Sequence, residues 1–350
     1  MKTGKSLTEL AAEIERQKSV KSDYIADTTA LSMTTAGTLN ISGNGGDMPI
    51  NPIAHRQIGE RVGIPAKYYD RMLKESPELL AKNVNHWLRE TPERRMVRTL
   101  DGSVRAFLSD RYQRIDNYDV ANVALPVLGE VGGIKVLSTD ITQSRLYIKA
   151  TTSEVTAEVK SRRVGDIVEA GVMITNSEVG LGAINIKPFA HFLVCTNGMV
   201  RDKSTLRAAH VGRRVEDGDI NGLLSDGTKR LEDLAVLSKV RDVIKAAFDA
   251  ARFADWIAKI EETTVQRIDG DVPKVVEALA EHYVLNESER SSVLRHLIEG
   301  GDLSRYGLVN AVTRTAEDLQ SYDRATELET IGGNLIELPS SDWRVIAKAA

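Results

Sequence analysis

The sequence predicts an α+β protein with a central, mostly antiparallel sheet, an N-terminal helical hairpin and a C-terminal helical region. Three observations predict this class. Capped helical patterns precede residue 90, alternating apolar runs with glycine turns occupy the middle, and helical periodicity returns after about residue 222. We therefore expect an N-terminal helical region at 1–90, an antiparallel β-rich core with basic patches at 91–214 and an acidic helical region at 215–350.

The composition is that of a globular protein. Of the 350 residues, 42% are hydrophobic and 27% are charged, and no apolar run reaches the roughly 20 residues that span a bilayer. The first residues form a charged amphipathic pattern, which differs from a signal peptide. Cys195 is the only cysteine, which excludes an internal disulfide and a cysteine-built zinc site. We expect a cytoplasmic protein with no membrane partner, no cofactor and no bound metal.

Capping residues delimit the first elements. Asn51 followed by Pro52 is a typical helix start, Gly63 is a typical end, and Ser76-Pro77 begins another helix. We expect helices over 5–19, 53–62, 66–75 and 79–89, and a strand over 38–42.

The segment 51–75 also resembles a helix-turn-helix, with Gly63 in the turn. A DNA-binding version would turn Lys67, Tyr68, Tyr69 and Arg71 toward a groove. An ordinary helical hairpin is the better interpretation, because any three-helix block with a short turn produces this pattern. Both interpretations remain open at this point.

Asp101-Gly102 is a strong turn signal between two apolar runs, so it predicts a β-hairpin over 96–100 and 104–108. Arginines gather on this hairpin and just after it, with Tyr112 among them. Guanidinium groups beside an aromatic ring suit a groove for single-stranded nucleic acid. Alternation along the strand equally allows these arginines to form the solvent face.

The elements after the hairpin follow from turn and cap residues. Asp116 and Asn117 cap a helix that ends before Gly132-Gly133. We expect a helix over 117–128, strands over 134–137 and 145–150, and a mobile basic loop over 151–163.

The stretch 166–214 is the densest in the chain. Two apolar runs, 168–174 and 183–195, have the composition of core strands, and each leads to a polar turn. The polar site candidates in this stretch are Asn176, Ser177, Glu178, Asn197 and His210. Turn chemistry explains most of them, and a buried Glu178 would need a partner such as an arginine.

Helical patterns dominate the remainder. We expect one long helix or two over 223–264, then helices over 272–283, 288–299 and 303–322. The pairs Gly300-Gly301 and Gly332-Gly333 are predicted to break helices. A short apolar piece over 335–338 follows, and Trp343 anchors the last turn.

Charge is unevenly distributed along the chain. Residues 89–214 hold 19 basic and 14 acidic residues, a net charge of +5, whereas residues 215–350 hold 16 and 26, a net charge of −10. The middle segment is therefore the part expected to meet a polyanion. The residues expected to bind nucleic acid are Arg98, Arg105, Arg111, Tyr112, Arg114, Arg162, Arg163, Lys187, Arg201, Lys203, Arg213 and Arg214.

Several strings resemble a known family: LSDRYQRIDN (108–117), GVMITNSEVG (171–180), FLVCTNGMV (192–200), AHVGRR (209–214), GLVNAVTRTAEDL (307–319) and ETIGGNLIEL (329–338). They are similar to a phage- and plasmid-borne bacterial family catalogued as domain of unknown function nine-three-two. The resemblance covers about residues 50–345 and implies a cytoplasmic mobile-element protein, without implying catalytic residues. At the level of fold alone, the order of elements is similar to single-strand annealing proteins of the phage Red-beta type.

The leading hypothesis is a single-stranded DNA-binding or annealing protein that acts in recombination without covalent chemistry, as a homo-oligomer. One alternative is a metal-assisted nuclease or hydrolase built on the turns at Asn176–Glu178 and Cys195–Asn197. Another is a protein-interaction module that counters a host defence through a host protein partner.

Overall fold

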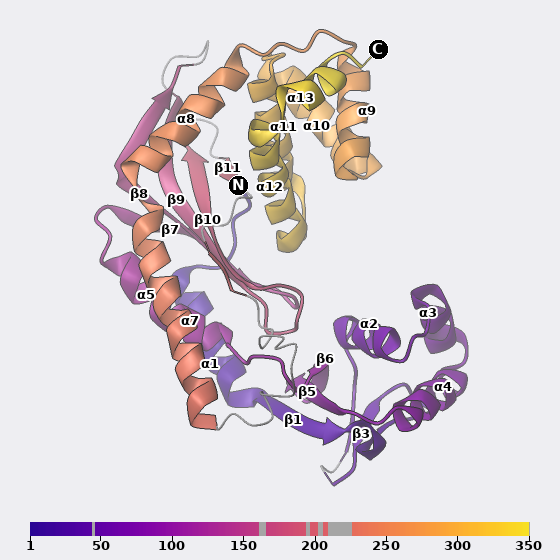
Figure 1. Ribbon diagram of the computed structural model, residues 1–350. Coiled ribbons are helices and arrows are strands. Elements are labelled where there is room, and N and C mark those ends of the chain that lie inside the picture. Colours follow the sequence, from indigo (N-terminus) through magenta and orange to yellow (C-terminus); the bar gives the residue numbers. More distant parts are fainter. Residues whose placement is uncertain (44–45, 161–165, 194–196, 202–205, 209–225, 350) are drawn as a thin grey trace.

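The computed structural model describes residues 1–43, 46–160, 166–193, 197–201, 206–208 and 226–349. It confirms the α+β class, because antiparallel sheets lie between helices at both ends of the chain. The molecule is a crescent (Figure 1). We name its two ends the N-terminal lobe (residues 21–109) and the C-terminal lobe (residues 250–349). A six-stranded central sheet joins them.

The N-terminal lobe contains two three-stranded sheets, β1-β5-β6 and β2-β3-β4, and a helical hairpin. Its strands are β1 (Lys21–Asp27), β2 (Leu31–Met33), β3 (Leu39–Ile41), β4 (Asp47–Met48), β5 (Arg94–Leu100) and β6 (Ser103–Ser109), and its helices are η1 (Thr28–Ala30), α2 (Pro52–Arg61), α3 (Ala66–Glu75) and α4 (Pro77–Glu90). Apolar residues of all these layers form one core. The helices were predicted within a few residues, and Asn51 accepts the expected capping hydrogen bond from the Ala54 amide at 2.8 Å.

The pairing of strand β1 with β5 crosses the boundary expected at residue 90. All seven residues of β1 pair with β5, in a register that places Lys21 opposite Leu100. A boundary at residue 90 would therefore divide this sheet. The β5–β6 hairpin itself was predicted correctly, since Asp101 and Gly102 have φ values of 52° and 73°. A two-residue turn of this kind needs positive φ at both positions.

The central sheet has the order β11-β10-β9-β8-β7, and β12 also pairs with β10. Its strands are β7 (Ile134–Ile141), β8 (Leu146–Val159), β9 (Asp166–Asn176), β10 (Ile184–Phe192), β11 (Gly198–Val200) and β12 (Leu206–Ala208). The mobile loop expected from residue 151 is wrong up to Val159, because β8 continues through these residues and pairs with β9. The register of β8 against β9 shifts between Thr152 and Thr156. After this shift, Val155, Ala157 and Val159 pack on the C-terminal core.

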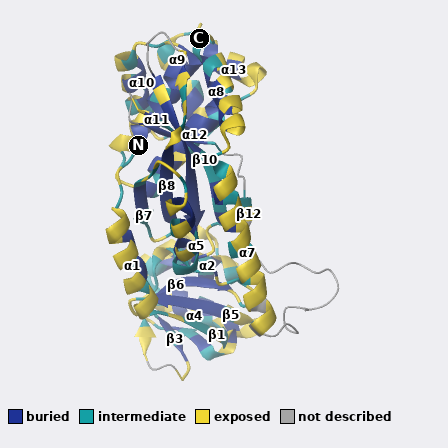
Figure 2. Ribbon diagram, turned by 90° about the vertical axis from the view of Figure 1, so that its left-hand side faces the viewer, coloured by how far each residue is buried: buried dark blue, intermediate teal, exposed yellow. Residues whose placement is uncertain are grey.

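The two faces of the central sheet differ because side chains alternate along each strand. Even-numbered residues such as Ile148, Val172 and Ile186 form an apolar face. Helices α1 (Leu7–Val20), α5 (Asn117–Gly129) and α7 (Asp226–Ala247) pack against its strands. Figure 2 shows the buried strands between the exposed outer sides of α1 and α7. Odd-numbered residues form the opposite face, which carries more polar side chains.

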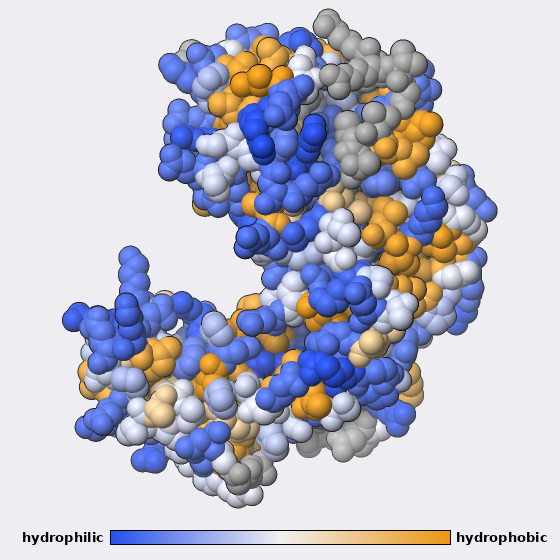
Figure 3. All heavy atoms as spheres, turned by 180° about the vertical axis from the view of Figure 1, so that it is seen from behind, coloured by the Kyte–Doolittle hydropathy of each residue, from blue (hydrophilic) through white to orange (hydrophobic). Residues whose placement is uncertain are grey.

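Figure 3 shows that the opposite side of the crescent is deeply hollowed between the two lobes. In Figure 1 the ends of the β7–β8 and β9–β10 hairpins project into this concavity, with α12 (Tyr322–Glu337) above them and α2 below. None of the described helices combines the length and the apolar composition that a membrane-spanning helix needs.

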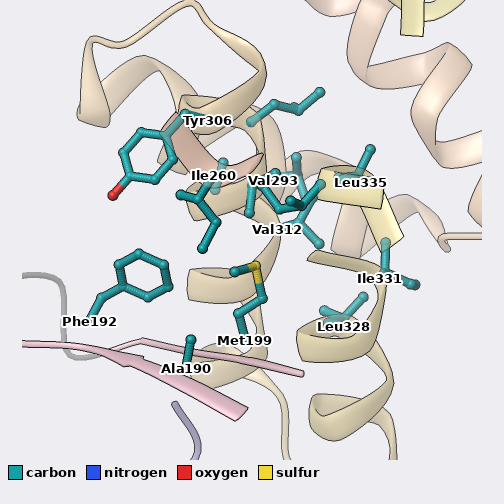
Figure 4. Close-up of a cluster of buried hydrophobic side chains, with 14 of the residues drawn as sticks. Ala190, Phe192, Met199, Ile260, Val293, Tyr306, Val312, Leu328, Ile331 and Leu335 are labelled. Atoms are coloured by element: carbon teal, nitrogen blue, oxygen red, sulfur yellow. The ribbon is translucent and has the colours of Figure 1, made fainter. Parts of the chain in front are cut away.

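The C-terminal lobe encloses the far end of the central sheet. Its helices are α8 (Ala250–Thr264), α9 (Val272–Tyr283), α10 (Glu287–Gly300), α11 (Arg305–Asp318), α12 and α13 (Ser340–Ala347). Figure 4 shows their apolar side chains packing onto Ala190, Phe192 and Met199 of the sheet. The core is continuous from strand to helix, so the lobe and the sheet form one folding unit.

The helix break predicted at Gly332-Gly333 is wrong, because both residues lie inside α12. These residues are glycine because the helix approaches its neighbours closely: a Cβ on Gly333 would lie 1.9 Å from the Val200 carbonyl oxygen, and one on Gly332 would lie 2.3 Å from Thr313 Cγ2. By contrast, Gly301 ends α10 in the left-handed conformation with φ of 66°, as expected for a terminating glycine.

Candidate functional site

The polar face of the central sheet and helix α12 line an open cavity of about 370 Å³. Volumes of this order, at the lower end of the range for ligand pockets, suit one small ligand or one nucleotide unit. The strands supply alternate residues, which all point to the same side. The lining residues are Arg145, Tyr147, Met173, Thr175, Asn185, Lys187, Asp323, Arg324, Thr326, Glu327, Thr330 and Ile331.

Asp323, at the N-terminal end of α12, is held by hydroxyl groups of the β7–β8 hairpin. Tyr147 and Thr142 donate to its Oδ1 at 2.7 and 3.0 Å, and Ser144 donates to its Oδ2 at 2.8 Å. Burial and the neighbouring Asp323 carboxylate raise the pKa of Tyr147 above its ordinary value. Tyr147 therefore stays a neutral donor, and these contacts fix the cavity wall where α12 meets the sheet.

Arg145 is one of the cations that line the cavity. Its guanidinium donates to the Leu181 carbonyl oxygen on the neighbouring hairpin, and within the described ranges no carboxylate lies at ion-pair distance from it. Arg324, by contrast, binds both oxygens of Glu289 at 2.8 Å and Glu327 at 2.7 Å. The half-buried Arg145 therefore keeps N–H groups that can donate hydrogen bonds to a ligand oxygen.

A buried ion pair lies behind the cavity. Lys149 donates to Glu329 at 2.5 Å, and neither side chain is exposed to solvent. Lys149 also lies 4.8 Å from the centre of the Tyr322 ring and 3.3 Å from the hydroxyl oxygen of Thr326, which lines the cavity. Breaking this buried pair would leave an uncompensated charge, which is costly. The pair therefore holds α12 in place on the sheet at the floor of the cavity.

The turn at Asn176–Glu178 is buried at the junction between the central sheet and the N-terminal lobe. Glu178 has the arginine partner that its burial requires, because its Oε2 lies 2.6 Å from Arg105 Nη2. Its other oxygen accepts a hydrogen bond of 2.5 Å from the Asn117 amide. The Asn176 side chain donates to Asn117 at 2.9 Å and to the Ile115 carbonyl oxygen at 3.1 Å. The turn therefore connects structural elements and exposes no carboxylate to a substrate.

The other candidates for catalysis or metal binding that lie in the described ranges give no open site either. Ser177 is buried and donates to the Ser144 carbonyl oxygen at 2.8 Å. Asn197 is also buried and donates to Thr313 and Asn310 at 2.6 and 3.2 Å. His210 and Cys195 lie outside the described residues. Within the described part of the chain, no three His, Cys, Asp or Glu side chains are placed to hold a metal ion together.

Three of the arginines expected to contact phosphate are engaged inside the fold, so this role is corrected for them. Arg98 has no exposed surface and binds Asp23 and Asp116. Arg105 pairs with Glu178, and Arg201 pairs with Glu337 at 2.8 Å. These guanidinium groups could reach a phosphate only by leaving buried or half-buried carboxylates unpaired, which is costly.

The remaining predicted residues are distributed as follows. Arg111 and Arg114 are exposed on the loop after β6, and Lys187 lines the cavity. Tyr112 is half-buried, and its hydroxyl donates to the Ser177 carbonyl oxygen at 2.7 Å. Arg162, Arg163, Lys203, Arg213 and Arg214 lie outside the described residues. The described residues among those expected to bind nucleic acid therefore lie in different parts of the fold, and several of them are paired with carboxylates.

Sequence reasoning missed the cavity itself, with Arg145, Asn185 and Asp323. One signal was present: polar residues recur at odd positions of strands whose even positions are apolar, which predicts one polar sheet face. The position of α12 on that face could not be read from the sequence. No family model, no curated protein and no solved structure was found to match this chain.

Proposed function

We propose that this protein binds single-stranded nucleic acid along its concave face and acts by binding alone. One observation carries the proposal: Arg145 lies in a cavity on that face without a carboxylate partner among the described residues. A guanidinium group in such a place is suited to a phosphate, because its donors match two phosphate oxygens.

The other lining residues suit the remaining parts of a nucleotide. Lys187 adds a second cation on the same wall, and Asn185 offers both a donor and an acceptor. Thr175 and Thr330 add hydroxyl groups. Such groups can bind phosphate and sugar oxygens, and these contacts carry no sequence information, as expected for a protein that binds any single strand.

We propose that the bound strand continues beyond the cavity toward the N-terminal lobe. Beyond the cavity, the surface continues over Leu181, whose carbonyl oxygen contacts Arg145, to Gly180. A Cβ on Gly180 would meet Leu108 of β6 and Gln57 of α2. A strand placed on this path would extend from the cavity to the N-terminal lobe, near the exposed Arg111.

The family resemblance of the sequence motifs supports finer proposals. They are a cytoplasmic protein of a phage or plasmid, a role in strand annealing during recombination, and action as a homo-oligomer. None of these follows from the cavity, and each depends on the quoted motifs and on the fold-level likeness to annealing proteins.

Binding of a fluorescently labelled oligothymidylate tests the proposal. We expect an affinity that falls steeply between about 50 and 200 mM salt, since phosphate contacts release counterions. Arg145→Ala should weaken binding about tenfold or more, as expected for a lost charge-assisted contact, and should reduce the salt slope by about one contact. Arg344→Ala, on the exposed side of α13, is the matched control and should bind as the wild type does.

Two results would reject the proposal. One is the absence of binding at low salt. The other is equal affinity of the wild type and the Arg145→Ala variant, with both proteins shown to be folded by circular dichroism.

A further inference from the structure

Helix α3 lies at the lip of the concavity on the N-terminal lobe, opposite α12 (Figure 1). Its inner side is firmly held. Tyr69 and Met72 are buried, and the Tyr69 hydroxyl lies 3.0 Å from His55 Nδ1 of α2. The two helices approach closely at Gly59, where a Cβ would lie 3.0 Å from the Tyr69 ring. Tyr69 therefore belongs to the core and does not face a groove, which corrects one of the four residues expected there.

The outer side of α3 is a cationic stripe. Lys67, Arg71 and Lys74 are exposed at positions i, i+4 and i+7, and Tyr68 beside them has 48% of its surface exposed. Residues at this spacing share one face of a helix. Across the described ranges, no carboxylate pairs with Lys67 or Lys74.

The nearby acidic groups neutralise this stripe only in part. Arg71 pairs with Glu75 at 2.8 Å, but both side chains are more than half exposed. Asp70 is engaged by Arg56 of α2. Exposed pairs of this kind contribute at most about 1 kcal/mol, so Arg71 can exchange Glu75 for a phosphate at little cost.

We propose that the α3 stripe binds duplex nucleic acid, so that the preferred ligand is a junction between a duplex and a single strand. A rigid helix with a cationic outer face fits the major groove, which is about 12 Å wide. The inference rests on the proposed function, because the single-stranded part of the junction would occupy the concave face. The α2–α3 hairpin turns at Gly63, with φ of 68°, and presents α3 outward.

Three labelled probes test this assignment: an oligothymidylate, a blunt duplex and a duplex with an oligothymidylate tail. The tailed duplex should bind more tightly than either simple probe, at least tenfold. The double variant Lys67→Ala/Lys74→Ala should weaken binding of both duplex probes about tenfold and reduce their salt slope by about two phosphate contacts. Its affinity for the oligothymidylate should change less than twofold. Lys82→Ala/Arg89→Ala, on the exposed side of α4, removes the same charge and should leave all three affinities unchanged.

The outcomes separate the two proposals. If the oligothymidylate binds but the duplex probes do not respond to Lys67→Ala/Lys74→Ala, the α3 inference is overturned and the proposed function stands. If the duplex responds but the wild type does not bind the oligothymidylate, the proposed function fails and α3 is left as a duplex-binding helix without the junction preference. Equal loss of duplex affinity in the α4 control also overturns the assignment to α3.

Discussion

Arg98 Nη2 donates a hydrogen bond of 2.6 Å to Asp116 Oδ1, and this contact connects strand β5 to the N-cap of helix α5. Arg98 also donates to Asp23 at 2.8 and 3.1 Å and to the Glu178 carbonyl oxygen at 3.0 Å. Burial alone would lower the pKa of Arg98, but the carboxylates of Asp116 and Asp23 raise it on balance. One buried guanidinium thus joins four segments where the N-terminal lobe meets the central sheet.

Replacing Arg98 should therefore destabilise the whole protein. In an Arg98→Met variant, two poorly exposed carboxylates lose their common partner, and we expect the free energy of unfolding to fall by about 3–5 kcal/mol. Urea denaturation measures this change. Arg94→Met, at an exposed position of the same strand, should change the stability by less than about 0.5 kcal/mol. Equal stability of the two variants would contradict the role of Arg98 at this junction.

Asp116 should make stability depend on pH in the acid range. Burial alone would raise its pKa, but Arg98 and Lys21 lower it below the ordinary value. The unfolded chain then binds more protons than the folded one. The stabilisation is complete above the unfolded pKa of about 4 and is lost as the pH falls through the folded pKa. The stability difference between wild type and Asp116→Asn should shrink on going from neutral pH to below pH 4.

Urea denaturation across this pH range measures that difference. Asp342→Asn, at an exposed position in α13, is the control and should follow the wild type at every pH. A difference between wild type and Asp116→Asn that does not depend on pH would argue against the predicted coupling.

Gly333 should not tolerate a side chain. Because a Cβ would lie 1.9 Å from the Val200 carbonyl oxygen, Gly333→Ala forces α12 away from β11, and overpacking of this kind costs about 1–3 kcal/mol. Thermal unfolding measures the loss. Gly300→Ala, where a Cβ meets no atom within 4 Å, should leave the melting temperature unchanged or slightly higher. A neutral Gly333→Ala variant would show that the close approach is not needed.

Val284 should be a site of stabilising substitution. This exposed, β-branched residue ends α9 in the left-handed conformation, with φ of 52° and ψ of 51°. Such a conformation costs a non-glycine residue about 1–2 kcal/mol, so Val284→Gly should raise the free energy of unfolding by about 1 kcal/mol. Val265→Gly, at an equally exposed helix end with φ of −92°, relieves no strain and should give no gain.

Local elements could be predicted because their signals lie within a few residues. Asn51-Pro52 starts α2, and Asp101-Gly102 forms the hairpin turn, as expected. Tertiary contacts decided the rest. Residues after Thr151 remain in β8 only because β9 pairs with them, and Gly333 is helical because α12 must approach β11. Neither partner is local in the sequence.

The candidate site was harder to predict for the same reason. An arginine on a strand is most often exposed, and nothing near Arg98 in the sequence shows that Asp23 and Asp116 surround it. Arg145 and Asp323 line one cavity although 178 positions separate them in the chain. The alternation of polar residues in the sequence predicts one polar sheet face. The cavity forms only because helix α12 packs on that face and supplies its other wall.

The pairing of β1 with β5 has a consequence for synthesis of the protein. A growing chain leaves the ribosome from its first residue onward, so Lys21–Asp27 emerges long before its partner, which extends to Leu100. Until then the nascent strand has an unsatisfied backbone on both edges. The helices α2–α4 are made in that interval, and because their backbone hydrogen bonds are local in the sequence, they can begin to form first. Strand β1 would then join a sheet that only the later hairpin completes.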